Sequence, residues 1–258
     1  LNTSIGTYKL SVQIIFTVFM ILGGMNFNVY YLLLVARKPK EAFLYEEARY
    51  YLILFFGAAA LIAWNIRGYY GNIAEAFHHA LFQVASLGST TGFSTADFDQ
   101  WPEFSKAVLL VIMAVGACAG STGGGFKVSR ILVLVQDMRR ELLRVVHPQI
   151  VKKPHLEGRV VDDETVSSIR SYLIIYLVVC MVSFLFLSLD NYDMETNLSA
   201  VLANLNNVGP GFHAVGPTCN YGGYSVFSKF VLMFDMLTGR LELLPMLLLF
   251  SPRVWKKY

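Results

Sequence analysis

Five long apolar runs constrain the fold of this chain more than any other feature. They cover residues 11–36, 50–66, 107–136, 171–189 and 227–250. Most of them approach or exceed the roughly 20 residues that a helix needs to cross the hydrocarbon core of a bilayer. Hydrophobic residues make up 55% of the sequence, against about 45–50% in an ordinary soluble domain. We therefore expect an all-α membrane protein with five spans.

The basic residues are unevenly distributed along the chain. Of the 21 lysines and arginines, four lie in residues 37–49, seven in residues 139–170 and three in residues 253–257. If the spans alternate in direction, all three basic patches lie on one side, which the positive-inside rule makes the cytoplasm. The sequence thus predicts a multi-pass protein in contact with membrane lipid, with a cytoplasmic C-terminus.

A repeated unit of span, short helix, polar turn and span organises most of the chain. Its two copies begin with spans at about 45–66 and 168–189, short helices at about 73–87 and 195–205, and turns at 88–95 and 206–211. The short helices cannot cross a bilayer, so we interpret them as re-entrant pore helices, each followed by a pore loop. Non-helical backbone is tolerated at this depth only where it is buried in protein or lines a water-filled cavity. The turn glycines Gly92 and Gly209 correspond, 117 positions apart.

Both turns match the Thr-Val-Gly-Tyr-Gly pattern of potassium-channel filters. The predicted ion-binding residues are Thr90, Thr91, Gly92, Phe93, Asn207, Val208, Gly209 and Pro210. A filter for a dehydrated alkali cation needs a row of backbone carbonyls and a glycine that lets the chain turn without side-chain clash. Pro210 departs from the pattern because it removes an amide donor and stiffens the loop. The alternative, two ordinary polar loops, leaves the two short amphipathic helices without a role.

A glycine-rich stretch interrupts the third apolar run and is the predicted gate. Its residues are Gly120, Ser121, Thr122, Gly123, Gly124, Gly125 and, after Phe126, Lys127. Each glycine costs a helix about 1 kcal/mol relative to alanine, so the helix is expected to break, and we favour an unwound loop across the pore over a simple kink.

Arg240 is the second gate candidate, because it lies at the equivalent depth of the last apolar run. An intramembrane arginine is a functional candidate by default, and below a cation filter it would set an electrostatic barrier. An ion pair with Glu242 is the alternative.

Other polar residues give weaker signals. The first apolar run, residues 11–36, contains Gly23, Gly24 and Asn26 near its middle. This group indicates either close helix packing or a surface that faces the pore. His78 and His79 are adjacent on a helix and point in different directions, which disfavours a metal site. An intramembrane enzyme that uses Ser121 or His79 is also disfavoured, since no base lies at helical spacing from Ser121. We expect no enzymatic activity.

Four motifs, in residues 89–95, 119–127, 207–211 and 239–242, resemble the Trk/Ktr/HKT superfamily of potassium transporters. Within it the chain is most similar to the bacterial Trk-type potassium uptake membrane subunit. The motifs occur in the family's order, and the resemblance covers essentially the whole chain. It implies four span–loop–span repeats around one pore. Residues 1–40 would then be the final span of a truncated preceding repeat, residues 41–150 the third pore repeat and residues 151–258 the fourth.

The resemblance also implies the function and partners. We expect potassium uptake across the bacterial inner membrane, with K⁺ held at the eight filter residues and no organic cofactor. The expected partners are the remaining pore repeats of the full-length chain, a second copy in a homodimer and a cytoplasmic nucleotide-binding regulatory subunit. No nucleic acid is expected. The alternative is a cation-coupled secondary transporter with re-entrant loops, but such repeats are commonly inverted, whereas both units here start on the same side.

Overall fold

The computed structural model describes residues 4–147, 149, 153–241 and 243–249, and these are mostly helical. The helices are α1 (Leu10–Gly24), α2 (Phe27–Tyr30), α3 (Pro39–Phe43), α4 (Glu46–Ile66), α5 (Ile73–Gly88), α6 (Glu103–Val115), α7 (Val128–Val146), α8 (Asp163–Leu187), α9 (Met194–Leu205), α10 (Val226–Arg240) and α11 (Leu243–Leu248). A π-helical turn η1 (Tyr31–Val35) follows α2, and four 3-10 turns are η2 (Phe98–Gln100), η3 (Ser188–Asp190), η4 (His213–Val215) and η5 (Tyr221–Gly223). Strands β1 (His155–Leu156) and β2 (Arg159–Val160) form an antiparallel hairpin. Glu242, the third basic patch and the C-terminal residue lie outside the described residues.

The prediction of five spans is correct only in part. Among the described residues, two helical segments are long and apolar enough to cross a membrane, Glu46–Ile66 and Asp163–Asp190. A third candidate is the pair Leu10–Gly24 and Phe27–Val35, which is bent by 98° at its break. The other two runs are interrupted. A loop divides residues 107–136 between α6 and α7, and α10 ends at Arg240.

The bend between α1 and α2 lies at the glycine-rich break that the sequence indicates. An added Cβ at Gly24 would collide with the hydroxyl of Tyr51, so α1 approaches α4 closely only because this residue is glycine. Asn26 is buried, and its side-chain oxygen accepts a hydrogen bond from the N–H of Asn28 (2.9 Å) and caps α2. Its amide nitrogen donates to Glu47 (2.8 Å). Gly24 thus takes part in close helix packing, one of the two predicted alternatives. The break also contacts residues 118–122 through backbone hydrogen bonds, and the pore-facing alternative stays a prediction.

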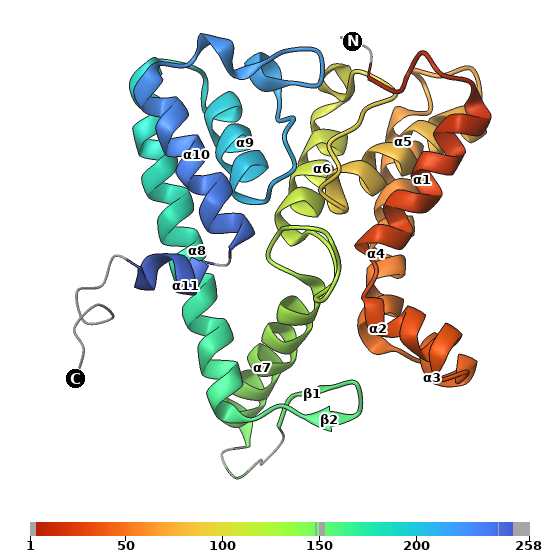
Figure 1. Ribbon diagram of the computed structural model, residues 1–258, viewed down its shortest axis with the longest axis vertical. Coiled ribbons are helices and arrows are strands. Elements are labelled where there is room, and N and C mark those ends of the chain that lie inside the picture. Colours follow the sequence, from red (N-terminus) through yellow and green to blue (C-terminus); the bar gives the residue numbers. More distant parts are fainter. Residues whose placement is uncertain (1–3, 148, 150–152, 242, 250–258) are drawn as a thin grey trace.

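The helices form two groups with α6 and α7 between them (Figure 1). In one group α4 packs against α5 and in the other α9 packs against α8 and α10, while α6 contacts both α5 and α9. The short helices start where an acceptor side chain caps them: Asn72 accepts from the N–H of Glu75 (2.8 Å) and Asp193 from that of Thr196 (2.9 Å). Their C-terminal halves are buried. Both polar turns therefore begin inside the protein.

The described parts of two of the three predicted basic patches lie at the same end of the molecule. The described segments with these basic residues, 37–49, 139–147 and 153–170, belong to the end that carries α3, β1 and β2, opposite the loop that precedes α10 (Figure 1). Acidic residues of the same segments pair with several of these lysines and arginines. We call this end the basic face, and its assignment to the cytoplasm stays a prediction.

Gly239 provides a test of the packing of α10 on α9. An added Cβ there would collide with the carbonyl oxygen of Leu205, so we expect Gly239→Ala to destabilise the full-length protein by about 1–3 kcal/mol, as overpacking does. Gly57→Ala is the matched control, because an added Cβ at this exposed position of α4 meets nothing within 4 Å. Thermal unfolding in detergent measures both, and equal melting temperatures would contradict the close contact.

Candidate functional site

The turn after α5 has a distinct backbone geometry. Thr90 has a φ of 60° and Gly92 a φ of 81°, in the left-handed region that glycine adopts readily. The N–H groups of Thr91 (2.8 Å) and Gly92 (3.4 Å) both donate to the carbonyl oxygen of Ser86. These bonds close the last turn of α5 and direct the chain away from the helix axis.

The turn after α9 has the same geometry. Asn207 has a φ of 58° and Gly209 a φ of 106°. The N–H groups of Val208 (2.7 Å) and Gly209 (3.3 Å) both donate to the carbonyl oxygen of Ala203. Each of these residues lies 117 positions after its counterpart in the first turn. Two different sequences therefore adopt one backbone conformation, with the glycine in the same place.

The two turns lie against each other. An added Cβ at Gly92 would collide with the carbonyl oxygen of Val208 and would lie 3.2 Å from the ring of Pro210. Within the described chain, no donor bonds to the carbonyl oxygens of Thr91, Gly92 or Val208. The turns thus place unoccupied backbone acceptors close together.

Two of the predicted filter residues have carbonyl oxygens that the protein itself occupies. The hydroxyl of Ser86 donates to the carbonyl oxygen of Phe93, and the hydroxyl of Tyr221 donates to that of Gly209 (2.6 Å). The ring of Phe93 packs edge-on against Phe16 of α1, with ring centroids 5.5 Å apart. Each of these carbonyl oxygens retains a second lone pair, so the ion-binding role of Phe93 and Gly209 stays a prediction.

Side chains anchor each turn to its surroundings. The hydroxyl of Thr90 accepts a hydrogen bond from the N–H of Gly124 (2.8 Å), and the amide of Asn207 donates to the carbonyl oxygen of Met236 (3.1 Å). The turns are thereby tied to the gate stretch and to α10.

Residues 116–127 form a loop that leaves the helical path and returns to it. Its backbone visits the left-handed region at Gly116 (φ 73°), Gly120 (67°), Gly125 (85°) and Lys127 (84°). The N–H of Lys127 donates to the carbonyl oxygen of Val115 (2.9 Å), so the two ends of the loop are adjacent and α7 begins beside the end of α6. The interruption is an unwound loop, as favoured from the sequence, and not a kink.

This loop contacts the C-terminal ends of both short helices. An added Cβ at Gly124 would collide with the carbonyl oxygen of Asn206, and one at Gly123 would lie 3.1 Å from that of Ser89. Only glycine allows so close an approach of three backbone segments. The loop and the two turns therefore form one contiguous site.

The two basic residues predicted at the gate both reach loop carbonyls. A guanidinium nitrogen of Arg240 donates to the carbonyl oxygen of Thr122 (3.0 Å), and the ammonium of Lys127 donates to that of Gly123. The structure thus brings together Arg240 and a loop that precedes it by more than a hundred residues in the sequence.

The groups considered for catalysis or metal binding have other contacts. The hydroxyl of Ser121 donates to the carbonyl oxygen of Cys118 (2.6 Å). His79 contacts the hydroxyl of Thr95 (3.0 Å) and His78 contacts Gln13 (2.8 Å). No cluster of three His, Cys, Asp or Glu side chains suited to a metal ion occurs among the residues that the structure describes.

Glu47 belongs to the site, although the sequence analysis did not select it. Its side chain is buried at 2% exposure, and its carboxylate accepts hydrogen bonds from the N–H groups of Ala119 (2.6 Å) and Ser129 (3.1 Å). The sequence shows only an acidic residue in the first turn of a helix, which the helix dipole already explains. Its partners lie too far along the chain for any local pattern to indicate them.

Charged side chains join the two units at the end opposite the hairpin. Lys106 lies between Glu103 (2.9 Å) and Glu195 (3.1 Å). Glu195 also contacts His213 (2.8 Å), whose backbone N–H donates to Asp99 (2.9 Å). The hydrogen bond to Glu195, aided by the negative charges of Glu195 and Asp99, raises the pKa of His213, while burial and Lys106 oppose the rise. This network connects the segment after the Gly209 turn to the segment after the Gly92 turn.

A comparison with known families decides the assignment. The model of the TrkH family, described as a cation transport protein, matches residues 68–257. The chain belongs to the TrkH family of cation transport proteins. The predicted resemblance to Trk-type transporters is thereby confirmed.

Individual members of the TrkH family match nearly all of this chain. It is 33% identical over 260 residues to the Trk system potassium uptake protein TrkH of Escherichia coli K12, which covers 99% of this chain and 53% of that protein. It is 28% identical over 248 residues to TrkG of the same strain, covering 95% and 50% respectively. The crystal structure of the potassium transporter TrkH from Vibrio parahaemolyticus superposes with a TM-score of 0.88 at 33% identity, covering 98% of this chain and 55% of that one. The chain thus spans about half the length of the curated relatives it matches.

The raised pKa of His213 predicts a pH-dependent stability of this TrkH-family fold. Because the folded pKa lies above the value of about 6.5 for an unfolded histidine, the contribution is complete below that pH and is lost as the pH rises through the folded pKa. The side chain is 44% exposed, so screening limits the effect to about 1 kcal/mol or less. We expect His213→Asn to lower the melting temperature of the full-length protein in acid and to have little effect in alkali. A deficit that grew with pH would contradict the ion pair.

Proposed function

We propose that this chain contributes two repeats to a potassium-conducting pore in the bacterial inner membrane, with the Gly92 and Gly209 turns in its selectivity filter and residues 116–127 as its gate. The observation that carries the proposal is the shared backbone geometry of the two turns and their direct contact. Relatives named as potassium uptake proteins support K⁺ as the transported ion.

The filter would use the carbonyl oxygens that the protein leaves unoccupied. Backbone carbonyls replace the hydration shell of a dehydrated cation, and those of Thr91, Gly92 and Val208 have no donor among the described residues. The partial negative charge at the C-terminal ends of α5 and α9 favours a cation nearby. Thr90 and Asn207 would in addition hold the turns in place through their side chains.

The gate would be the loop itself together with its two basic contacts. Residues 120–125 lie against the ends of both short helices, and Arg240 and Lys127 bring positive charge to the loop carbonyls. A positive charge in a cation pathway forms an electrostatic barrier. The loop would therefore block the pathway sterically, and its two basic contacts would add an electrostatic barrier to cations.

Two turns do not enclose a pore, so the complete filter requires other segments. We propose that the remaining pore repeats of the full-length chain supply them, that two copies form a homodimer, and that a cytoplasmic nucleotide-binding subunit regulates the pair at the basic face. The division into residues 1–40, 41–150 and 151–258 follows from the same proposal.

Gly92→Ser tests the filter. Its positive φ and its contact with Val208 leave no room for a side chain, so we expect the substitution to displace the carbonyls and shift ion preference toward Na⁺. The measurement is growth at limiting K⁺, with K⁺ and Na⁺ uptake, of an uptake-deficient bacterium that expresses the full-length protein.

Gly68→Ser is the control for that experiment, because an added Cβ at Gly68 meets nothing within 4 Å. It should retain both the uptake rate and the ion preference. If Gly92→Ser, at the same amount in the membrane, behaved like Gly68→Ser, the turn would not be part of the filter.

Deletion of residues 120–124 tests the gate. Removal of the loop contacts should raise K⁺ flux per molecule, because the segment that lies against both turns is shortened. Flux into vesicles that contain the purified full-length protein gives the rate directly. A rate equal to that of the unaltered protein would exclude this loop as the gate.

A further inference from the structure

Glu47 gathers three donors from segments that are distant in sequence. Its Oε1 accepts from the N–H groups of Ala119 and Ser129, and its Oε2 accepts from the side-chain amide of Asn26 (2.8 Å). Ala119 lies in the loop, Ser129 is the second residue of α7, and Asn26 is at the bend between α1 and α2. A buried carboxylate is stable only when such partners are present. The side chain of Glu47 therefore connects the loop to the start of α7 and to the bend between α1 and α2.

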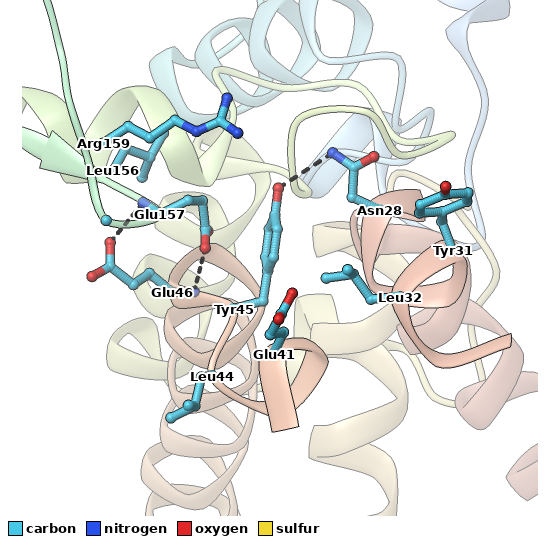
Figure 2. A pocket seen from close by; sticks show the side chains of 11 residues that line it. Asn28, Tyr31, Leu32, Glu41, Leu44, Tyr45, Glu46, Leu156, Glu157 and Arg159 are labelled. Atoms are coloured by element: carbon cyan, nitrogen blue, oxygen red, sulfur yellow. Dashed lines mark hydrogen bonds between the residues drawn. The ribbon is translucent and has the colours of Figure 1, made fainter. Parts of the chain in front are cut away.

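The position of Glu47 is in turn set by Glu157. The carboxylate of Glu157 accepts a hydrogen bond from the N–H of Glu46 (3.0 Å), and the N–H of Glu157 donates to the side chain of Glu46 (3.0 Å) (Figure 2). The same carboxylate also accepts from the N–H of Glu47 (2.9 Å). The first N–H groups of a helix lack intrahelical partners and favour a negative charge. Glu157 thus caps α4 from outside the helix.

The hairpin places Glu157 at this position. Glu157 (φ 53°) and Gly158 (φ 72°) are the two turn residues between β1 and β2, a geometry that suits a tight hairpin. The hairpin is also bonded to α7, because the side chain of Gln136 exchanges two hydrogen bonds with the backbone of His155 (2.8 and 2.9 Å). A pocket of about 670 Å³ separates it from α2 and η1 (Figure 2). The hairpin is therefore hydrogen-bonded both to α4, which carries Glu47, and to α7, which follows the loop.

We propose that Glu47 is a positioning residue for the loop and that Glu157 extends this control to the hairpin, so that the hairpin sets how firmly the loop occupies its place. The proposal rests on the proposed function of residues 116–127 as a gate. Weakening either carboxylate would release the loop and raise the maximal flux. It would change the half-saturating K⁺ concentration less than the maximal flux, because the turns keep their hydrogen bonds to the carbonyl oxygens of Ser86 and Ala203, which do not involve the loop.

A polarity swap tests Glu47. In Glu47→Gln the new amide nitrogen would face the side-chain amide nitrogen of Asn26, so that two hydrogen-bond donors oppose each other. In Asn26→Asp the new carboxylate would repel the buried carboxylate of Glu47. The double variant restores a donor–acceptor pair, and the carboxylate introduced by Asn26→Asp still caps α2. We expect each single variant to raise maximal flux about tenfold, corresponding to about 1.4 kcal/mol, the scale of a hydrogen bond to a charged group. The double variant should return toward the unaltered rate.

Glu157→Ala tests the hairpin, with Glu164→Ala as the control. Glu164 is an exposed acid in the first turn of α8, so both variants remove one negative charge from the same end of the molecule. We expect Glu157→Ala to raise maximal flux per molecule and Glu164→Ala to leave it unchanged. All rates are divided by the amount of protein in the membrane.

The deletion of residues 120–124 separates the possible failures. If the deletion raises flux but Glu157→Ala matches Glu164→Ala, the gate stands and the role of the hairpin is refuted. If the deletion raises flux and the double variant is no closer to the unaltered rate than its parents, the role of Glu47 as a positioning residue is refuted. If the deletion has no effect, the proposed gate itself fails. Should Glu47→Gln not reach the membrane, Glu157→Ala and the double variant still decide the question.

Discussion

Backbone N–H and C=O groups that leave helical geometry inside a membrane must find partners within the protein, because lipid offers none. The irregular segments here meet this constraint in a few concentrated contacts. The carbonyl oxygens of Ser86 and Ala203 each accept two N–H groups of a turn, and the carboxylate of Glu47 accepts one N–H group from the loop and one from the first turn of α7. Among the carbonyl groups of the turns that have no donor in the described chain, that of Val208 lies directly against Gly92.

Glycine has a steric role at this site as well as a conformational one. At Gly92, Gly124 and Gly239 the place of a side chain is occupied by a carbonyl oxygen from another segment. Turns, loop and α10 therefore approach within backbone contact of one another. Such packing couples them, because no one of these segments can move without affecting the next. The proposed filter and gate are for this reason parts of one packed unit.

Local sequence signals located the short helices and the loop well. The expected helices at 73–87 and 195–205 differ from Ile73–Gly88 and Met194–Leu205 by one residue at one end, because a capping side chain begins each and a polar turn ends it. The glycine-rich loop was predictable because no helix tolerates so many glycines. The 98° bend after α1 was indicated only as a break, since its angle depends on how Asn26 and Glu47 pack. The hairpin around Glu157 has too few residues to produce a periodic pattern.

The sequence by itself determined the class of molecule, the positions of the two turns and of the loop, and the family, because apolar run length, glycine content and motif order are properties of contiguous residues. Only the tertiary structure decided that the turns touch, that Arg240 reaches Thr122 across 118 positions, and that Glu47 binds Ala119 across 72. These contacts join side chains and backbone from different helices. Their geometry depends on how the helices cross, and no local pattern in the chain records it.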